Sequence, residues 1–277
     1  MGNTATKARE AHAQAKSKPK NNRNIQEQKI KTAKTTGVLA LPNCKLKNLP
    51  EELLHLSMLR TLDLTGNKLS DLPPQVNALK MLKTLKVSSN MLETLPDLSA
   101  LEALTTLVLD GNVLEDIPNV LPPNLIKLSL KSNRLSTVPR SVLALTQLQE
   151  LDLSENKLES LSAHLGEMHE LQELILDGNK LTELPAALAR CVKLKVLSAR
   201  RNTLVGQSAG AKVQSITAEV LGENSAVQVM NLEGNPMTKE DLQKMDGFDA
   251  FLTRRTKLKN KEIHGGLNAD LSLCGLS

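Results

Sequence analysis

The sequence predicts an α/β solenoid, a curved horseshoe with parallel strands on its concave face and short helical turns on its convex face. The first observation is a phrase, L-x-x-L-x-L-x-x-N-x-L, that recurs nine times. The second is its even spacing, because a fixed period of roughly 20–30 residues marks stacked repeats. The third is composition: 40% of the residues are hydrophobic, with two Phe and no Trp or Tyr, as expected where leucine fills one repeated slot. The asparagine position of the phrase falls at Cys44, Asn67, Asn90, Asn112, Asn133, Asn156, Asn179, Asn202 and Asn235.

Each repeat begins with a short strand, as at 171–176, whose leucines at the first, fourth and sixth positions of the phrase point inward. One repeat cannot bury this side alone, so neighbouring repeats must stack. The asparagine amide both donates and accepts, so stacked copies can satisfy the backbone of a tight turn. This consensus and period are those of the leucine-rich repeat. Cys44 takes the asparagine position in the first repeat, where we expect a buried structural thiol.

The segment after each phrase is expected to form one or two helical turns on the convex side. A proline in six repeats prevents the chain from re-entering a strand ladder, whereas the sixth repeat has Ser162 there. The eighth repeat is longer, since 33 residues separate Asn202 from Asn235. Its extra residues, about 205–225, predict a flexible loop followed by a helix near Ile216. The prolines are Pro50, Pro73, Pro96, Pro118, Pro139 and Pro185.

The repeats, at 36–237, lie between two expected helical caps. Residues 1–23 are expected to be a disordered basic arm. Asn24, with an acid three residues later, predicts the N-cap of a capping helix over 24–35. A second capping helix with a basic end is expected over 238–261, and a flexible tail over 262–277. The apolar residues expected to cover the open ends are Ile25, Ile30 and Ala33 at the first repeat and Leu242, Met245, Phe248, Phe251 and Leu252 at the last.

The charge is unevenly distributed. Residues 1–35 hold nine Lys or Arg and two acids, a net charge of +7, whereas 36–253 hold 21 basic and 26 acidic residues, a net charge of −5. Basic ends favour an anionic surface as partner. The start, Met1-Gly2-Asn3-Thr4-Ala5-Thr6, matches the N-myristoylation signal, with Gly2 as the acylated residue. A single myristoyl chain binds membranes only marginally, so a second signal is needed. The arm provides one in Lys7, Arg9, Lys16, Lys18, Lys20 and Arg23.

The last four residues, Cys274-Gly275-Leu276-Ser277, fit a prenylation pattern with Cys274 as the lipidated residue, although Gly275 is not aliphatic. The alternative is an ordinary tail that carries a cysteine. A transferase could reach Cys274 on the expected flexible tail. Upstream lies a fitting basic companion: Arg254, Arg255, Lys257, Lys259 and Lys261.

Composition and motifs also bound the compartment and the chemistry. The three cysteines lie far apart and make no disulfide framework, and there is no secretory or membrane-spanning stretch. We therefore expect an intracellular, cytoplasmic protein that is peripheral on a membrane. No catalytic or phosphate-binding motif is present and the five His are not at ligand spacing, so neither enzyme activity, metal nor cofactor is expected. Nucleic acid is not expected as a partner, because no aromatic residue interleaves the basic clusters.

Exposed strand positions form the concave face in this fold, and we expect a protein partner there. The hypothesis centres on an acidic run in repeats six and seven that basic residues follow at once. The alternative is a surface that merely aids solubility. Because this face has no aromatic residues, binding should be electrostatically steered and moderate in affinity. We expect the chain to be a monomer. The candidate partner-binding residues are Glu150, Asp152, Glu173, Ile175, Asp177, Lys195 and Arg200.

Several motifs resemble the family of small, myristoylated, intracellular proteins typified by leucine-rich repeat-containing protein 57. These are the Met-Gly-Asn start, the entry Lys34-Thr35-Thr36-Gly37-Val38, the 23-residue repeats with Leu-Pro, and the ending around Gly247-Phe248-Asp249-Ala250-Phe251. The resemblance covers about 1–6 and 25–260 and implies a non-enzymatic repeat protein. This chain differs by its longer basic arm, its longer eighth repeat and its added tail.

These features favour a non-catalytic interaction scaffold anchored to the cytoplasmic face of a membrane by N-myristoylation and basic residues. The alternative is a soluble regulatory subunit that docks on a phosphatase or small GTPase. An enzyme is the weakest of the three classes.

Overall fold

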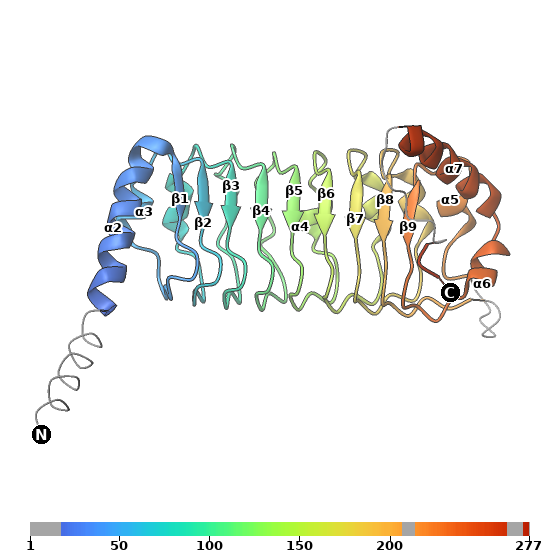
Figure 1. The fold of residues 1–277 in the computed structure, drawn as a ribbon, viewed down its shortest axis with the longest axis horizontal. Coiled ribbons are helices and arrows are strands. Elements are labelled where there is room, and N and C mark those ends of the chain that lie inside the picture. Colours follow the sequence, from blue (N-terminus) through green and yellow to red (C-terminus); the bar gives the residue numbers. More distant parts are fainter. Residues whose placement is uncertain (1–17, 207–213, 265–273, 277) are drawn as a thin grey trace, which may run out of the picture.

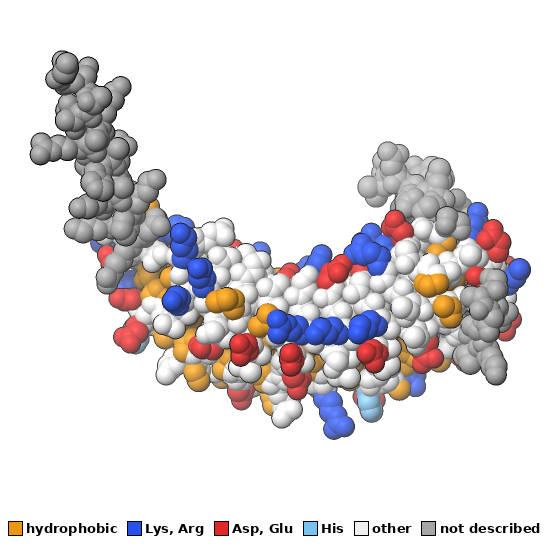
Figure 2. Space-filling model, turned by 90° about the horizontal axis from the view of Figure 1, so that it is seen from below, with side chains coloured by type: hydrophobic (Ala, Val, Ile, Leu, Met, Phe, Trp, Pro, Cys, Tyr) orange, Lys and Arg blue, Asp and Glu red, His pale blue; other side chains and the backbone are white. Residues whose placement is uncertain are grey.

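The computed structural model describes residues 18–206, 214–264 and 274–276, and it confirms the predicted leucine-rich repeat solenoid. Nine strands form one parallel sheet in sequence order (Figure 1). The short helical turns between the strands lie behind the sheet, on the convex side, while α2 and α7 lie at its two ends (Figure 1), and Figure 2 shows the curvature of the stack. The strands are β1 (Val38–Ala40), β2 (Thr61–Asp63), β3 (Thr84–Lys86), β4 (Thr106–Val108), β5 (Lys127–Ser129), β6 (Glu150–Asp152), β7 (Glu173–Ile175), β8 (Val196–Ser198) and β9 (Val229–Asn231).

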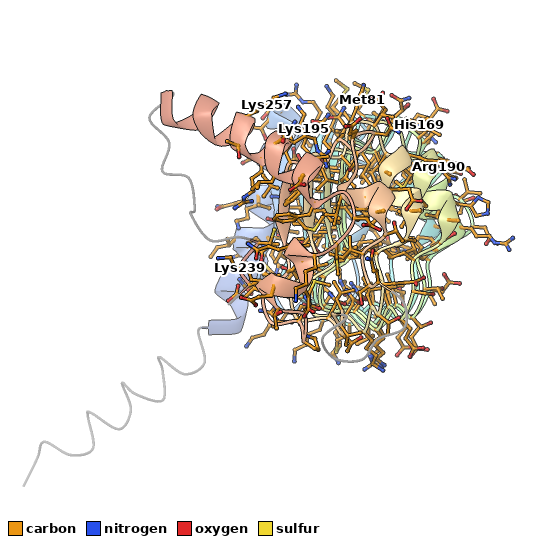
Figure 3. All side chains as sticks on the ribbon, turned by 90° about the vertical axis from the view of Figure 1, so that its right-hand side faces the viewer. Met81, His169, Arg190, Lys195, Lys239 and Lys257 are labelled. Carbon is orange, nitrogen blue, oxygen red and sulfur yellow. The ribbon has the colours of Figure 1, made fainter. Side chains whose placement is uncertain are left out.

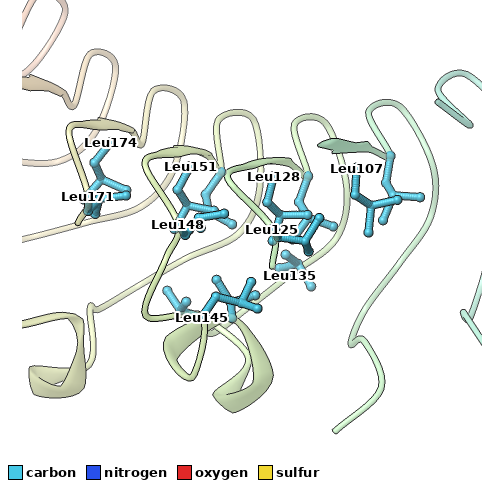
Figure 4. Packing of buried hydrophobic residues seen from close by; sticks show 14 of the residues in the cluster. Leu107, Leu125, Leu128, Leu135, Leu145, Leu148, Leu151, Leu171 and Leu174 are labelled. Carbon is cyan, nitrogen blue, oxygen red and sulfur yellow. The ribbon is translucent and has the colours of Figure 1, made fainter. Parts of the chain in front are cut away.

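Each strand holds positions three to five of the phrase, counted from its first leucine, and neighbouring strands pair position for position. Leu151, at position four, lies opposite Leu128 on one side and Leu174 on the other. Side chains alternate along a strand, so the position-four residue points into the core while positions three and five face the concave side. The leucine columns that result are continuous from repeat to repeat (Figure 4). Leu148, Leu151 and Leu174 are all at most 1% exposed.

The asparagine at position nine ties each repeat to the one before it, which confirms its predicted structural role. The Nδ2 of Asn156 donates to the carbonyl of Leu153 in its own repeat at 3.0 Å and to that of Leu130 in the preceding repeat at 2.9 Å. Its Oδ1 accepts from the N–H of Leu135 at 3.0 Å. Cys44 has no preceding repeat to serve. It is half-buried rather than buried as expected, and its Sγ donates to the Pro42 carbonyl at 3.5 Å.

Position eight always has a positive φ, because the chain must reverse sharply after the strand. Glycine suits this left-handed conformation, yet five of the nine repeats use another residue. The glycine and non-glycine residues at this position lie beside one another in neighbouring repeats. Gly178 lies beside the Glu155 side chain of the preceding repeat. Arg201, one repeat further on, reaches across Gly178 to pair with Glu155 at 2.5 Å. The position-eight residues are Asn43, Gly66, Ser89, Gly111, Ser132, Glu155, Gly178, Arg201 and Gly234.

Short helical turns follow most strands on the convex side, as the prolines predict. In five of these turns the residue before the first helical one is Pro50, Pro73, Pro139, Pro185 or Ser162. Ser162 replaces the proline by accepting the His164 N–H at 3.2 Å. Repeats three and four lack such a helix although they have the proline. The turns are α3 (Glu51–Leu54), η1 (Pro74–Ala78), α4 (Arg140–Leu143), η2 (Ala163–Glu167), η3 (Ala186–Arg190) and, within the long eighth repeat, α5 (Ala218–Leu221).

The long eighth repeat does not interrupt the asparagine ladder. The Nδ2 of Asn235 still donates to the Ala199 carbonyl at 2.8 Å, and its Oδ1 accepts from Leu204 N at 3.1 Å. The expected helix near Ile216 is present as α5, and Ile216 forms a bridge with Leu184. The start of the expected flexible loop, 207–213, lies outside the described residues.

The N-terminal cap is longer than the sequence indicates. Helix α2 (Lys18–Thr36) begins six residues before Asn24, so the predicted N-cap is wrong and 18–23 are helical rather than disordered. Polar helix-forming residues such as Lys and Gln allow the helix to extend beyond its packed part. Ile30 and Ala33 are buried on the first repeat as expected, but Ile25 is 45% exposed because it lies before that contact. Residues 1–17 lie outside the description.

The C-terminal cap is two helices instead of one. Helix α6 (Lys239–Gln243) begins with a capping box between Thr238 and Asp241, and α7 (Phe248–His264) follows Gly247, whose φ of +86° no continuous helix allows. Leu242, Met245, Phe248 and Phe251 are buried as expected. Leu252 is 40% exposed instead of buried, although it lies in the same helix as Phe248 and Phe251.

Candidate functional site

A small cavity lies on the concave face where β5, β6 and β7 meet. Its volume is about 90 Å³, and the residues that line it include Leu128, Ser129 and Leu151. Four of the seven predicted partner-binding residues line it. We call the five side chains at its rim the central patch: Lys127, Glu150, Asp152, Glu173 and Ile175.

The central patch carries excess negative charge. The ammonium of Lys127 lies 2.5 Å from Oε2 of Glu150, and this hydrogen bond raises the pKa of Lys127, with Glu173 and Asp152 adding to the effect. Glu173 lies directly opposite Glu150 across the strand pair. Like charges in this register are destabilising. The Glu173 carboxylate accepts no hydrogen bond and forms no ion pair within the described part of the chain. The patch thus holds three carboxylates and one cation, and the carboxylates of Glu173 and Asp152 form no ion pair among the described residues around the half-exposed Ile175.

Asp177 does not belong to this surface, although the sequence predicted it there. It is only 3% exposed, because position seven turns its carboxylate along the sheet toward the next repeat. Oδ1 accepts from Ser198 Oγ at 2.6 Å and from Arg200 N at 2.9 Å. Oδ2 accepts from Arg200 Nε at 2.8 Å. Asp177 is thus a structural clamp between repeats seven and eight.

The same clamp joins repeats four and five, where the sequence analysis did not identify it. Asp110, also at position seven, accepts hydrogen bonds from Ser129 Oγ and, at 3.2 Å, from Lys131 N. Burial raises the pKa of Asp110, and the hydrogen bond from Ser129 opposes that rise. The sequence signal is an Asp at position seven followed by a Ser at position five of the next repeat, as in Asp177 and Ser198. By contrast, Asp152 at position five bonds within its own repeat, to Ser154 N at 2.9 Å.

The two basic residues predicted to join the site lie apart from the cavity. Arg200 is held by Asp177, and this hydrogen bond raises the pKa of the guanidinium. It also lies 3.8 Å from Glu233. Lys195 is exposed at position two, and in Figure 3 it lies near the same edge as Lys257 and Met81, away from Lys239. Neither basic residue lines the central cavity.

A row of basic side chains lies along the edge where the strands end (Figure 2), and acidic neighbours partly offset its charge. Position ten carries Arg134, Lys157 and Lys180 in consecutive repeats, each bonded through its N–H to the preceding repeat. Arg134 lies 3.9 Å from Glu115, and Lys180 lies 3.9 Å from Glu159. This edge is therefore a weaker candidate for an anionic partner than its Lys and Arg content indicates.

The predicted lipid sites are mostly beyond the described residues. Gly2, Lys7, Arg9 and Lys16 lie outside them. The backbone of Lys18, Lys20 and Arg23 forms the start of α2, whereas their side chains are outside the description.

Cys274 and Arg254, one of the basic residues upstream of it, both differ from expectation. Cys274 is 2% exposed, so the prediction of an accessible flexible tail is wrong for this residue. Arg254 is also not a free basic residue, because it donates to the carbonyls of Leu221, Gly222 and Val227 at 2.7–3.0 Å. Burial lowers the pKa of Arg254.

Neither a metal site nor a membrane-spanning helix is found among the described residues. No cluster of three His, Cys, Asp or Glu side chains suited to a metal ion occurs among the described residues. Nor does any helix in that part of the chain combine the length and apolarity needed to cross a bilayer.

Comparison with known proteins agrees with the geometry. The family model described as "Leucine rich repeat" matches residues 57–114 and 123–181. No curated protein matches the sequence. Among solved structures, a leucine-rich repeat protein of Leptospira interrogans is 28% identical with a TM-score of 0.62, over 74% of this chain and 56% of that one.

Two further structures are similar over less of their own length. The ectodomain of a plant membrane receptor kinase from Arabidopsis thaliana is 30% identical with a TM-score of 0.57, over 69% of this chain and 23% of that one. The functional domain of InlJ from Listeria monocytogenes is 23% identical with a TM-score of 0.60, over 80% and 44%, and supports the fold alone. The chain thus spans 56%, 23% and 44% of these three proteins.

Proposed function

The chain is a leucine-rich repeat protein, and we propose that it is a non-catalytic interaction scaffold whose protein partner docks on the central patch. Leucine-rich repeat domains commonly bind proteins through their concave face and are generally non-catalytic. The observation that carries the proposal is the pairing of Glu173 with Glu150 in direct register beside a cavity of about 90 Å³. A free solenoid would be more stable without that repulsion.

The central patch suits a basic side chain from the partner. The Lys127 ammonium pairs directly with Glu150 only, and one cation cannot offset three carboxylates, so Glu173 and Asp152 can still attract a basic group. The aliphatic stem of a Lys or Arg could pack on Ile175 while its charged head reaches the carboxylates. The end of one long side chain could enter the cavity between these carboxylates. Such contacts steer association and favour a basic partner surface.

Charge reversal tests this site. The variant Asp152→Lys/Glu173→Lys should capture the partner at least about tenfold less well, equivalent to about 1.4 kcal/mol of binding free energy. Glu93→Lys is the matched control, because Glu93 is exposed after the asparagine turn of repeat three, away from the patch. Partners are identified by affinity capture and quantitative mass spectrometry with all three proteins. An identical partner set and yield from the patch variant and the control would reject the central patch as the docking site.

A loss of partner capture reports on binding only if the double variant stays folded. Both patch residues are half-exposed, and a lysine at 173 removes the repulsion with Glu150. Asp152→Lys also removes the acceptor for the Ser154 N–H and hydroxyl, so the free energy of unfolding of the double variant should fall by about 1 kcal/mol, which leaves the repeats folded. Because the chain has no Trp or Tyr, unfolding is followed by circular dichroism instead of intrinsic fluorescence.

We further propose that Gly2 is myristoylated and that the basic arm holds this scaffold at the cytoplasmic face of a membrane. The support is the signal at Met1–Thr6 together with six Lys or Arg between Lys7 and Arg23. Each basic residue at an anionic surface adds about 1 kcal/mol to the marginal binding of one acyl chain.

Substitution of Gly2 tests the anchor. Gly2→Ala should move the protein from the membrane to the cytosolic fraction of a eukaryotic host, whereas Asn3→Ala, which keeps the acceptor glycine, should not. Loss of the basic residues Lys16 and Lys18 should weaken membrane binding in a salt-dependent way. Equal membrane fractions for wild type and Gly2→Ala would exclude acylation as the anchor.

A further inference from the structure

The last strand of the sheet, β9, has a neighbour that is not one of the nine strands. In consecutive repeats, the N–H at position six donates to the carbonyl at position five of the next repeat. Leu176 N donates to Ser198 O at 2.7 Å, and Ala199 N donates to Asn231 O at 2.8 Å. Leu232 N, the next in this series, donates to Cys274 O at 2.8 Å. The carbonyl of Cys274 therefore occupies the place of the tenth strand, although a strand is not formed there (Figure 1).

The segment Cys274–Gly275–Leu276 is fitted to this place. Cys274 is 2% and Leu276 9% exposed, and both belong to the same apolar cluster as the leucine columns. Gly275 lies so close to β9 that a Cβ would come within 2.9 Å of Glu233 Cβ and 3.0 Å of Asn231 Oδ1. Its φ is +70°, and Cys274 precedes it with a φ of 57°. Only glycine combines this backbone with so narrow a space.

The contact is specific but short. It consists of three described residues, and one of them, Cys274, is a non-glycine residue in the left-handed region, which costs conformational energy. The repeats, by contrast, are joined by a continuous core and by an asparagine ladder. Segments with few buried contacts open without global unfolding. Opening here would uncover an unpaired strand edge, which is a template for an extended peptide.

We propose that Cys274–Leu276 is a strap that closes the free edge of β9 and detaches as a unit, exposing the Cys274 thiol and this edge while the nine repeats stay folded. The closed strap withholds the thiol, whose pKa burial raises to about 11, so that it is protonated and unreactive. Any enzyme that modifies Cys274 must then act on the detached strap. This inference is independent of the central patch and of Gly2.

Thiol alkylation of the full chain tests the strap. In the reaction with iodoacetamide the thiolate forms a C–S bond as iodide leaves, and peptide mass mapping follows each cysteine separately. The rate for each is divided by its rate in the denatured chain. Cys44 is half-buried and Cys191 is fully buried in the core, so they set the fast and slow limits. In the wild type, Cys274 should react at least about tenfold more slowly than Cys44 and at least about tenfold faster than Cys191.

Gly275→Val should release the strap, because its side chain would clash with Glu233 and Asn231. The Cys274 rate should approach that of Cys44, while the Cys191 rate stays unchanged. Hydrogen exchange gives a second readout: Leu232 N–H should lose protection, whereas Ala199 N–H, which makes the same bond one repeat earlier, should keep it. Leu276→Ser should act in the same direction without altering the backbone at Gly275.

Two outcomes would overturn the proposal. If wild-type Cys274 reacts as fast as Cys44, the strap is not closed. If Cys274 reacts as slowly as Cys191 in the wild type and in both variants, the segment does not detach independently of the repeats.

Discussion

Asp110 in repeat four and Asp177 in repeat seven occupy the same position of the phrase and bind the same groups of the following repeat, a serine hydroxyl and a backbone N–H. They differ in their counter-charge. Asp177 also accepts from Arg200 Nε at 2.8 Å, whereas Asp110 has no cation within ion-pair distance among the described residues. The more buried carboxylate, Asp177, is therefore the one that is neutralised. A buried charge is tolerated where it is paired and hydrogen-bonded.

The comparison teaches that position within the repeat decides the role of a charge. Asp152 and Asp177 are both acids on neighbouring repeats, but position five faces the concave side and position seven points along the stack. One is available to a partner and the other holds two repeats together. An aspartate carboxylate therefore serves binding at position five of the phrase and stability at position seven.

The largest effect should come from removing the paired clamp. Asp177→Ala leaves Ser198 Oγ, Arg200 N and Arg200 Nε without their acceptor, at a cost of about 2–4 kcal/mol. Asp110→Ala removes two hydrogen bonds but also an unpaired, partly buried charge, so its cost should be about 1 kcal/mol. Urea unfolding followed by far-ultraviolet circular dichroism compares the two. Equal losses of stability would show that Arg200 contributes nothing to the clamp.

A smaller difference in stability is expected between alanine variants of the glycines that follow these aspartates. Gly111 and Gly178 have φ values of +64° and +65°, so alanine is strained at both, by about 1 kcal/mol. At 178 the new Cβ would also lie 2.7 Å from the Glu155 carboxylate, whereas at 111 the nearest atoms are those of Ser89 at 3.6 Å. Gly178→Ala should therefore displace the ion pair between Glu155 and Arg201 and cost about 0.5–1 kcal/mol more.

A double-mutant cycle isolates that difference. In a Glu155→Ala background neither the clash nor the ion pair exists, so Gly111→Ala and Gly178→Ala should lower the urea midpoint equally. A difference that persists without the Glu155 carboxylate would mean that backbone strain, not the crossing ion pair, separates the two glycines.

Much of the fold could be predicted from the sequence because it repeats. Leucine spacing, asparagine position and proline position each have one physical reason that applies in most of the repeats, and the sheet order and convex turns follow from them. The ends could not be predicted as well, because they do not repeat. The start of α2, the break at Gly247 and the position of Cys274 depend on contacts with the outermost repeats, which no period records.

The candidate site was predicted in part for the same reason. Alternation along a strand places Glu150, Asp152, Glu173 and Ile175 on the concave face, and all four line the cavity. Asp177 lies beyond the strand, where the turn sets its direction, so alternation no longer applies. The serine opposite it, Ser198, was the available signal, since a hydroxyl at position five can donate to a carboxylate at position seven of the preceding repeat.

The smallest expected effect is a pH dependence of the free energy of unfolding caused by Asp110, the clamp residue that has no counter-charge. Because burial raises the pKa of Asp110, the folded chain holds this proton over a pH range in which the unfolded chain has already lost it. The folded state then binds more protons than the unfolded state, so the contribution of Asp110 to the free energy of unfolding falls as pH rises through that range. Above the range the ionised carboxylate makes the fold less stable than a neutral acceptor would.

Asp110→Asn keeps an oxygen for Ser129 Oγ and Lys131 N but cannot ionise, so it should remove this slope and raise stability at neutral pH by less than about 1 kcal/mol. Urea midpoints of wild type and variant, measured from about pH 4 to pH 7, should therefore diverge with rising pH, in favour of Asn. Midpoints that instead diverge in favour of the wild type would show that the ionised Asp110 is stabilised in the fold, and that the clamps of repeats four and seven are electrostatically alike.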